Sequence, residues 1–420
     1  MREVSLFWIG VDWGDNTHAV HVFQPCSGNV KKCQVNHTVE GLGVLVSRIK
    51  ELGVEHIGGI AVESTRSPLL SALLEIDCPL YMINPKVSEN WRQAYTPAGA
   101  KSDGGDAIIL AQGLWHHHNH LSPVKLDDVS RRALRALTEV EQSLIAQHTS
   151  HVLSLKAMLK QYYPYALEFF DDWASPVAWE FLLAFPTAAS LAKATKNKLI
   201  RFLQARHIGM KPKWQRRIDN RAKALDWPHD SAQEEAYALY AQSQAKMLCA
   251  LEKELKKLRK RIEESFAKLE DAHIYESLPG AGKKLAPRIS VMFGGDQEMF
   301  DTADALRELS GTAPVTCQSG KRKVVHKRRA CRKKWRDTMH QFAFHSKRKC
   351  RWARAYYKLC MARGDNNATA LRKLANKWLA IIFRMWKEGV VYDEDKYVES
   401  LKKRNSTTYQ YMLTLGYAQK

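Results

Sequence analysis

The apolar positions of this chain follow two different periods, which divide it into an N-terminal part with strands and a longer helical remainder. Continuous apolar runs over 7–11 and 57–62 predict buried strands, and each run ends in a carboxylate, Asp12 or Glu63. Alternation of apolar and polar side chains over 19–23 predicts another strand. The N-terminal part therefore begins as a sheet that carries an acid at the end of two of its strands.

The segments around these strands complete an α/β pattern. We expect a further strand near 30–36, helices over 41–52 and 67–75, a short strand at 80–83, and helical segments flanking 90–100. The resulting order is strand, strand, strand, helix, strand, helix, strand, helix. This is the order of a ribonuclease-H-like α/β domain, which we expect to end near residue 125.

Helical periodicity dominates the rest of the chain. Apolar residues recur at helical spacing over 129–160, and an irregular segment rich in aromatic residues and proline follows at 162–230. Over 247–269 the apolar residues are three, four and seven apart with charged residues between them, which is typical of a coiled coil. A long helix packed on its own domain would give the same pattern, and of the two interpretations we favour pairing between chains.

These periods predict four parts. We expect an α/β domain over 1–125, a helical coiled-coil middle over 126–272, a mainly α-helical C-terminal domain over 273–400 and a tail over 401–420.

A short glycine-rich motif stands near the start of the expected C-terminal domain. Residues 277–289 read Ser-Leu-Pro-Gly-Ala-Gly-Lys-Lys-Leu-Ala-Pro-Arg-Ile, which resembles a helix-hairpin-helix motif. In that motif the backbone N–H groups at a helix start approach a phosphate. The predicted phosphate contacts are Gly280, Gly282, Lys283 and Lys284.

The charge of the chain indicates a polyanionic partner. Its formal net charge is +21, and residues 321–351 contain fourteen Lys or Arg and a single acid. Lys and Arg displace counterions from phosphates, and we interpret the neighbouring Trp335, Phe342, Phe344 and Trp352 as stacking residues for bases or sugars. The basic residues expected on nucleic acid are Lys321, Arg322, Lys323, Lys327, Arg328, Arg329, Arg332, Lys333 and Lys334.

Cysteine usage and hydropathy argue against secreted and membrane classes. The eight cysteines are scattered without a Cys-x-x-Cys pair, and we find neither a signal peptide nor an apolar stretch that could span a bilayer. We therefore expect a cytoplasmic protein with no membrane partner. The histidines at 116–118 and 120 could bind a transition metal, but no Cys or spaced His completes a four-ligand set, so we interpret them as a polar loop after a helix.

Four carboxylates have the spacing that metal-dependent phosphodiester chemistry needs. Asp12 and Glu63 follow strands, and Asp103 and Asp106 are three residues apart, so that one helix face can carry both. Two divalent ions about 3.5–4 Å apart can activate the attacking oxygen and stabilise the leaving one. We predict that these acids bind Mg²⁺ or Mn²⁺. The alternative is that each acid is a turn residue or a helix cap.

Together these motifs resemble a known family. Val11-Asp12, Val62-Glu63-Ser64 and Lys101-Ser102-Asp103-x-x-Asp106-Ala107 look like the N-terminal RuvC-like DEDD domain of transposases of the insertion sequence 110 family. The C-terminal half is similar to that family's second domain, and the matching segments are 278–282, 309–314 and 318–322.

The resemblance implies an RNA-guided, site-specific DNA recombinase with a composite active site. Asp12, Glu63, Asp103 and Asp106 would bind the metal, and Ser319 would be the nucleophile that forms a covalent serine–DNA intermediate. Ser310 competes for this role, but Ser319 leads directly into the basic run. The implied partners are double-stranded target and donor DNA, a structured bridge RNA, and copies of the chain in a homodimer or homotetramer. The implied location is the nucleoid of a prokaryotic cell.

Two other functions fit the same residues. A Holliday-junction resolvase or other metal-dependent nuclease would use the four acids with water in place of Ser319. A non-catalytic nucleic-acid-binding scaffold would use the acids only structurally.

Overall fold

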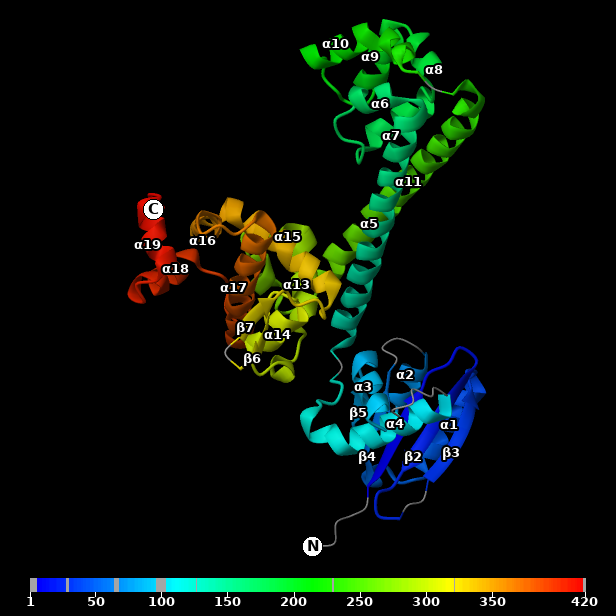
Figure 1. Ribbon diagram of the computed structural model, residues 1–420, viewed down its shortest axis with the longest axis vertical. Helices are drawn as coiled ribbons and strands as arrows, with labels where there is room; N and C mark the ends of the chain where they lie inside the picture. The colour runs from blue at the N-terminus through cyan, green and yellow to red at the C-terminus, as the bar shows by residue number, and fades with distance from the viewer. Residues whose placement is uncertain are drawn as a thin grey trace. The chain divides into compact units, whose positions relative to one another are not determined.

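The computed structural model describes residues 6–27, 30–63, 68–95, 103–125, 127–228, 230–320 and 322–417. They belong to two compact units, Met1–Leu126 and Asp127–Lys420, shown in Figure 1. No helix in the described part of the chain is both long and apolar enough to cross a membrane.

A mixed five-stranded sheet forms the centre of the first unit. Its strands are β1 (Phe7–Asp12), β2 (Thr17–Phe23), β3 (Val30–Asn36), β4 (Ile57–Val62) and β5 (Leu80–Met82), in the order β3-β2-β1-β4-β5. β1 is antiparallel to β2 and parallel to β4, and β4 is parallel to β5. The α/β character expected of the N-terminal part is therefore confirmed.

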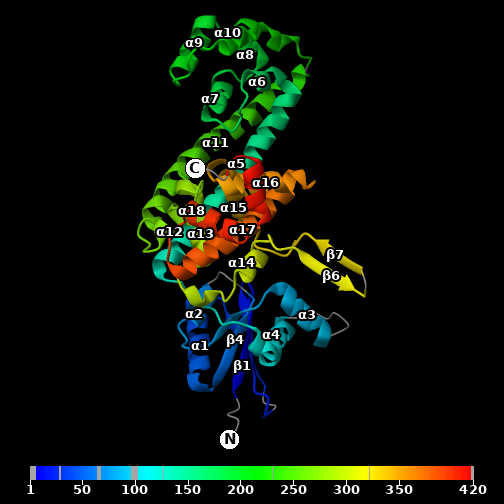
Figure 2. The ribbon, with the colours of Figure 1, turned by 90° about the vertical axis from the view of Figure 1, so that its left-hand side faces the viewer.

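Helices cover both faces of this sheet (Figure 2). On one face, α1 (Val39–Lys50) and α2 (Pro68–Leu73) share a core with Ile9, Val11 and Ile60. On the other face lie α3 (Pro85–Tyr95) and α4 (Asp103–His117), and Leu110 of α4 packs in one cluster with Trp8 and Ala61. Two short 3₁₀ turns, η1 (Val54–His56) and η2 (His118–His120), complete the unit.

Helix α4 lies directly on strand β1 because residue 10 is a glycine. A Cβ at Gly10 would lie 2.0 Å from the carbonyl oxygen of Ala107 and 2.6 Å from the nitrogen of Ala111. No other residue type fits such a backbone approach without moving the helix. Ala107, the residue after Asp106, makes this contact, so Asp106 is held beside the strand that ends in Asp12.

Two long helices, α5 (Val129–Tyr162) and α11 (Ser231–Phe266), pack against each other along their length in the second unit. They run antiparallel, because Leu134 near the start of α5 shares a core with Phe266, whereas Leu159 near its end shares a core with Ala238. The short helices between them form a separate aromatic core at the far end: α6 (Pro164–Phe169), α7 (Pro176–Ala184), α8 (Ala188–Ala192), α9 (Lys196–Gln204), α10 (Pro212–Asp219) and η3 (Asn220–Asp226).

Many of the apolar residues of α11 that predicted a coiled coil are buried by other helices of the same chain. Leu255, Ile262 and Phe266 are buried, whereas Met247 remains 45% exposed. Pairing between chains stays a prediction, and it would use exposed apolar residues of this helix pair, which include Val140, Leu153, Leu239 and Met247.

The C-terminal part of the second unit is mostly helical and has one apolar core. Its elements are α12 (Ala272–Glu276), α13 (Gly282–Phe293), η4 (Gln297–Met299), α14 (Ala303–Leu309), β6 (Val315–Ser319), β7 (Arg322–His326), α15 (Lys333–Lys349), α16 (Arg351–Ala362), α17 (Asn367–Glu388), α18 (Glu394–Lys403) and α19 (Thr407–Thr414). Trp352, Trp378 and Trp386 are fully or almost fully buried in that core.

The interpretation of the aromatic residues in the basic run as stacking residues is wrong for two of the four. Phe342 and Trp352 are both 0% exposed and pack on Trp378, at 5.0 and 4.8 Å between ring centroids. Phe344 is partly buried with Lys347 and Arg348 over its ring, and Trp335 is contacted by Arg332. The basic residues of α15 and α16 thus surround an apolar stripe that faces the core, as in any amphipathic helix.

A buried ion pair joins the long helices to α13. Glu141 of α5 is 1% exposed and accepts hydrogen bonds from Arg288 at 2.7 and 3.1 Å and from Arg259 of α11 at 3.2 Å. With donors on both carboxylate oxygens, the charge of Glu141 is compensated where water cannot reach it.

Replacing Gly10 by Ala should loosen α4. The added methyl group must displace backbone rather than a flexible side chain, so we expect a loss of about 1–3 kcal/mol in the stability of the first unit. Hydrogen–deuterium exchange followed by mass spectrometry should show faster exchange of the α4 amides.

Gly43→Ala is the matched control. Gly43 lies in α1 with nothing within 4 Å of its missing Cβ, so Ala there should leave exchange in α4 unchanged and stabilise α1 by about 0.5–1 kcal/mol. Unaltered α4 exchange in Gly10→Ala would show that the contact does not constrain the helix.

Candidate functional site

Two of the predicted acids stand side by side at one edge of the sheet. The parallel pairing of β1 with β4 ends at Val11 opposite Val62, and Asp12 and Glu63 are the next residues of the two strands. Because side chains alternate along a strand, Asp12 lies on the same face as Trp8 and Gly10, which is the face that α4 covers. Glu63 shares that face with Ala61 by the same alternation.

Helices α3 and α4 bring further groups to this edge. Asp106 of α4 is 6% exposed, and one of its carboxylate oxygens accepts a hydrogen bond from Nε of Arg92 at 2.8 Å and forms an ion pair with Nη2 of Arg92 at 2.8 Å. Glu63 accepts a hydrogen bond from the hydroxyl of Ser88. Ser88 and Arg92 are four residues apart on α3, so one face of that helix contacts both carboxylates.

The guanidinium of Arg92 interacts with several carboxylates. Arg92 also forms an ion pair with Glu89. Burial works against the charge of Arg92, but the carboxylates of Asp106, Glu89 and Glu63 raise the pKa of the guanidinium above its ordinary value. The edge of the sheet is therefore a place where carboxylates gather around positive charge, which is the environment that a divalent ion requires.

The fourth acid, Asp103, is the first residue of α4, one turn before Asp106. Its side chain lies outside the described part of the structure. Among the described residues, no three His, Cys, Asp or Glu side chains are already arranged around one point as metal ligands. The donor set nevertheless fits Mg²⁺ or Mn²⁺, because it consists of carboxylates around a site that already accommodates the guanidinium of Arg92.

Two histidines fix the turn that follows Asp12. His18 is fully buried, accepts from the backbone N–H of Gly14 at 3.3 Å and lies 2.8 Å from Nδ1 of His37 through its Nε2. Burial and the neighbouring His37 lower the pKa of His18, which favours the neutral form of that ring. The sequence carried no signal for this pair except the alternation of β2.

The predicted histidine cluster at 116–118 and 120 packs against aromatic rings. His117 stacks on Trp91 with 5.4 Å between centroids, and His118 lies 4.7 Å from Trp8. Nδ1 of His118 also contacts the carbonyl oxygen of Trp115 at 2.8 Å. These contacts give the cluster a packing role at the end of α4.

The two candidate serines differ sharply in access. Ser310 is 0% exposed at the end of α14, and its hydroxyl has no hydrogen-bond partner among the described residues. Ser319 ends β6 and is exposed beside Gly320, whose φ of +55° makes the turn into β7. Figure 2 shows this β6–β7 hairpin projecting from the helices of its unit. Of these two serines, Ser319 is the one whose hydroxyl a large substrate could reach while the protein stays folded.

Some of the predicted phosphate-binding residues form ion pairs or hydrogen bonds within the chain. Lys283 pairs with Glu263 at 2.9 Å, Arg328 with Glu308 at 2.9 Å, and Lys334 donates to the carbonyl oxygen of Glu139 at 3.0 Å. Lys321 lies outside the described residues. The others are exposed on the hairpin, the loop after it and the first turn of α15, and they comprise Arg322, Lys323, Lys327, Arg329, Arg332 and Lys333.

The glycine-rich turn joins α12 to α13 in left-handed backbone conformations. Gly280 has a φ of +86°, and a Cβ there would lie 3.0 Å from the backbone of His345. Gly280 thus packs on the chain's own helix α15. Gly282 and Lys284 are exposed at the start of α13, where backbone N–H groups would face a phosphate.

Sequence comparisons support the same assignment over both halves of the chain. A transposase family model, for the DEDD domain of IS110 elements, matches residues 9–164, and the model of the transposase IS116/IS110/IS902 family matches residues 272–358. The first match contains all four predicted acids and the second contains Ser319.

Full-length relatives agree. The chain is similar to the mini-circle putative transposase for IS117 of Streptomyces coelicolor, with 26% identity over 94% of this chain and 98% of the relative. It is 28% identical to an uncharacterized 42 kDa protein of insertion element IS900 of Mycobacterium paratuberculosis, over 92% and 96% of the two chains. An uncharacterized 43.6 kDa protein of insertion element IS110 of S. coelicolor is 24% identical over 93% and 96%.

The α/β domain, the order of its acids and the two family matches lead to one conclusion: the chain is a transposase of the IS110 family.

Proposed function

We propose that this transposase is an RNA-guided, site-specific DNA recombinase that cuts and rejoins strands through a covalent bond to Ser319. Its metal ligands are Asp12, Glu63, Asp103 and Asp106. The observation that carries the proposal is that α3 contacts Glu63 through Ser88 and Asp106 through Arg92, at the edge of the sheet where β1 ends in Asp12.

The reaction conserves phosphodiester bonds. The oxygen of Ser319 attacks the scissile phosphorus, a deoxyribose oxygen leaves and takes up a proton, and the serine hydroxyl gives up its own. A free deoxyribose hydroxyl of another strand then attacks the same phosphorus and releases the serine. Bound Mg²⁺ or Mn²⁺ supplies Lewis acidity toward the phosphate and the attacking oxygen. No ATP is needed, because one phosphoester bond forms for each one that breaks.

The protein residues prepare and position these groups. Ser88 and Arg92 orient the carboxylates of Glu63 and Asp106, and His18 holds the turn after Asp12. The hydroxyl of Ser319 is a weak nucleophile and requires activation, which metal ions bound by these carboxylates would supply. The exposed basic residues around the β6–β7 hairpin contact phosphates beside Ser319.

Target choice in this proposal comes from a structured bridge RNA that pairs with donor and target DNA. The protein then reads backbone and shape, as in other guided systems. Exchange between two duplexes requires at least two active sites, so we propose a homodimer or homotetramer that acts at the bacterial nucleoid.

Ser319→Ala should abolish covalent protein–DNA adducts and recombination. The measurement is a denaturing gel of labelled substrate DNA incubated with the chain, Mg²⁺ and the RNA from its own element. Ser310→Ala is the matched control and should keep both activities, because that hydroxyl is buried. A Ser319→Ala chain that still cuts DNA at full rate would favour the hydrolytic nuclease.

Asp12→Asn should reduce strand cleavage by about 10³-fold or more, because the neutral amide binds divalent ions poorly. Binding of DNA and RNA, measured by gel shift, should stay within about twofold of the parent chain. Undiminished recombination in this variant would exclude the metal site that we propose, and an absence of any cleavage by the parent chain would favour the scaffold.

Arg92→Gln should strengthen the binding of Mn²⁺ to the chain without nucleic acid by about tenfold, roughly 1.4 kcal/mol, since it removes a positive charge beside the ligands. Isothermal titration calorimetry measures this, with the exposed Arg48→Gln on α1 as the charge-matched control. Weaker Mn²⁺ binding in Arg92→Gln would contradict this prediction, because it would show that the orientation of Asp106 by Arg92 matters more than the repulsion between Arg92 and the metal ion.

A further inference from the structure

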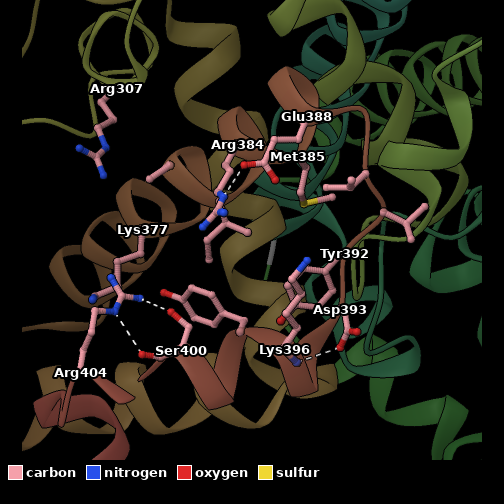
Figure 3. A pocket seen from close by; sticks show the side chains of 15 residues that line it. Arg307, Lys377, Arg384, Met385, Glu388, Tyr392, Asp393, Lys396, Ser400 and Arg404 are labelled. Carbon is pink, nitrogen blue, oxygen red and sulfur yellow. Dashed lines mark hydrogen bonds and ion pairs between the residues drawn. The ribbon is translucent and has the colours of Figure 1, made fainter. Parts of the chain in front are cut away.

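A cavity that none of the proposed catalytic residues lines lies in the C-terminal part of the second unit. It has a volume of about 380 Å³ and lies between α17, the segment that follows it, α18 and Arg307 of α14 (Figure 3). This volume is at the lower end of the range of about 300–1,000 Å³ that is typical of small-molecule sites.

One side of this cavity is cationic. Arg307, Lys377 and Arg404 line it together, and Figure 3 shows Lys377 beside Arg404. Arg404 donates to the hydroxyl of Ser400 at 2.7 Å and to its carbonyl oxygen at 3.1 Å, contacts that orient the guanidinium without neutralising it. Arg307 is held by the carbonyl oxygen of Asn376 at 3.2 Å and by Asp304 at 2.7 Å.

Lys377 is half-buried among these cations. Among the described residues its ammonium has no carboxylate partner, and it stands 4.5 Å from the centre of the Tyr356 ring. Burial lowers the pKa of Lys377, the nearby Cys360 works against that shift, and the charges of Arg404 and Arg307 add to it. A bound anion would relieve this repulsion between like charges.

The rest of the lining is mixed: apolar and aromatic residues stand beside Arg384 and Lys396, and Glu388 forms an ion pair with Arg384 at 2.7 Å. The apolar and aromatic residues include Ile381, Met385, Val390 and Tyr397. The ring of Tyr397 packs at 4.7 Å from the ring of Trp352, which holds it in place. Two acceptors, Glu388 and Asp393, stand at the other side of the cavity (Figure 3).

We propose that this cavity binds one unpaired nucleotide of a nucleic-acid strand, with its phosphate on Arg307, Lys377 and Arg404 and its base against Tyr397, Ile381 and Met385. Flat aromatic and aliphatic surfaces accept any base face, and neighbouring cations accept the backbone. The inference goes beyond strand exchange at Ser319, and it assigns to α17 and α18 a separate site for single-stranded segments.

The composition of the cavity favours a nucleotide over other anions. A free phosphate would leave the apolar surface of the cavity unfilled, and an acidic peptide would bring carboxylates but no flat base for the surface formed by Tyr397, Ile381 and Met385. Duplex nucleic acid keeps its bases stacked and cannot insert one without unpairing it. Single-stranded RNA and DNA share the chemistry that fits, and the test distinguishes them.

The experiment uses the full chain carrying Ser319→Ala, so that its outcome does not depend on catalysis. The probes are single strands of about ten nucleotides, one of RNA with 4-thiouridine and one of DNA with 4-thiothymidine, and a duplex of the same sequence. Fluorescence anisotropy measures affinity, and photocrosslinking with peptide mass spectrometry locates the contact.

We expect a crosslink within residues 377–404, and the strand that gives it identifies RNA or DNA as the source. Lys377→Gln combined with Arg404→Gln should weaken single-strand binding by about tenfold and remove the crosslink, while duplex binding changes little. Lys403→Gln, on the same helix but exposed and paired with Glu399, should change neither quantity. Variants are first compared by circular dichroism and thermal unfolding.

Two results would overturn the proposal. Crosslinks that all fall outside residues 377–404 would show that single strands bind elsewhere. Equal affinities of the double variant and Lys403→Gln would show that the cavity takes no nucleotide. Either result leaves the serine adduct assay untouched, so a failure here is distinct from a failure of the proposed recombination.

Discussion

The close approach of α4 to β1 is the contact on which the arrangement of the acids depends. With only a hydrogen at Gly10, the helix backbone lies against the strand backbone, and α4 is fixed both along and across the sheet. Asp106 is adjacent in sequence to the contacting residue Ala107, so its position is set by backbone geometry rather than by a flexible side chain. Asp12 and Glu63 are set in the same way, by the register of two parallel strands. A site that must hold divalent ions gains from such rigid support.

Electrostatics then explains how acids can be gathered before any metal arrives. Carboxylates brought together at a partly buried edge repel one another, and one cation among them offsets that cost. Arg92 takes this role from α3, an element outside the set of motifs that define the acids. In the second unit the charges have the opposite sign: Arg307 is paired with Asp304, whereas Lys377 and Arg404 line the same cavity without a carboxylate partner among the described residues.

Much of the first unit follows from the sequence because its signals are local. Continuous apolar runs and alternation give the strands, and the acids that end them lie where expected. Ser88, Arg92 and the pair His18–His37 escaped prediction because their roles arise from contacts between elements far apart in sequence, although the spacing of Ser88 and Arg92 on one helix face was available. The prediction that Phe342 and Trp352 stack on nucleic acid was wrong for a related reason. Both lie among Lys and Arg in the sequence, yet helical geometry turns them to the core. Burial depends on three-dimensional packing that local composition does not contain.

The antiparallel pair α5 and α11 has a consequence for how this protein can vary in length. A helix of 34 residues extends for roughly 50 Å, comparable to the span of about fifteen base pairs of duplex. Each residue added to a helix turns the part of the chain beyond it by about 100°. An insertion in α5 alone would therefore rotate the aromatic core that follows α5 away from its contacts with α11. Only matched additions to both helices, close to whole numbers of turns, preserve the packing. The length of this helix pair can therefore change only in steps of whole turns. We expect relatives to differ here by insertions or deletions of matching length in both helices.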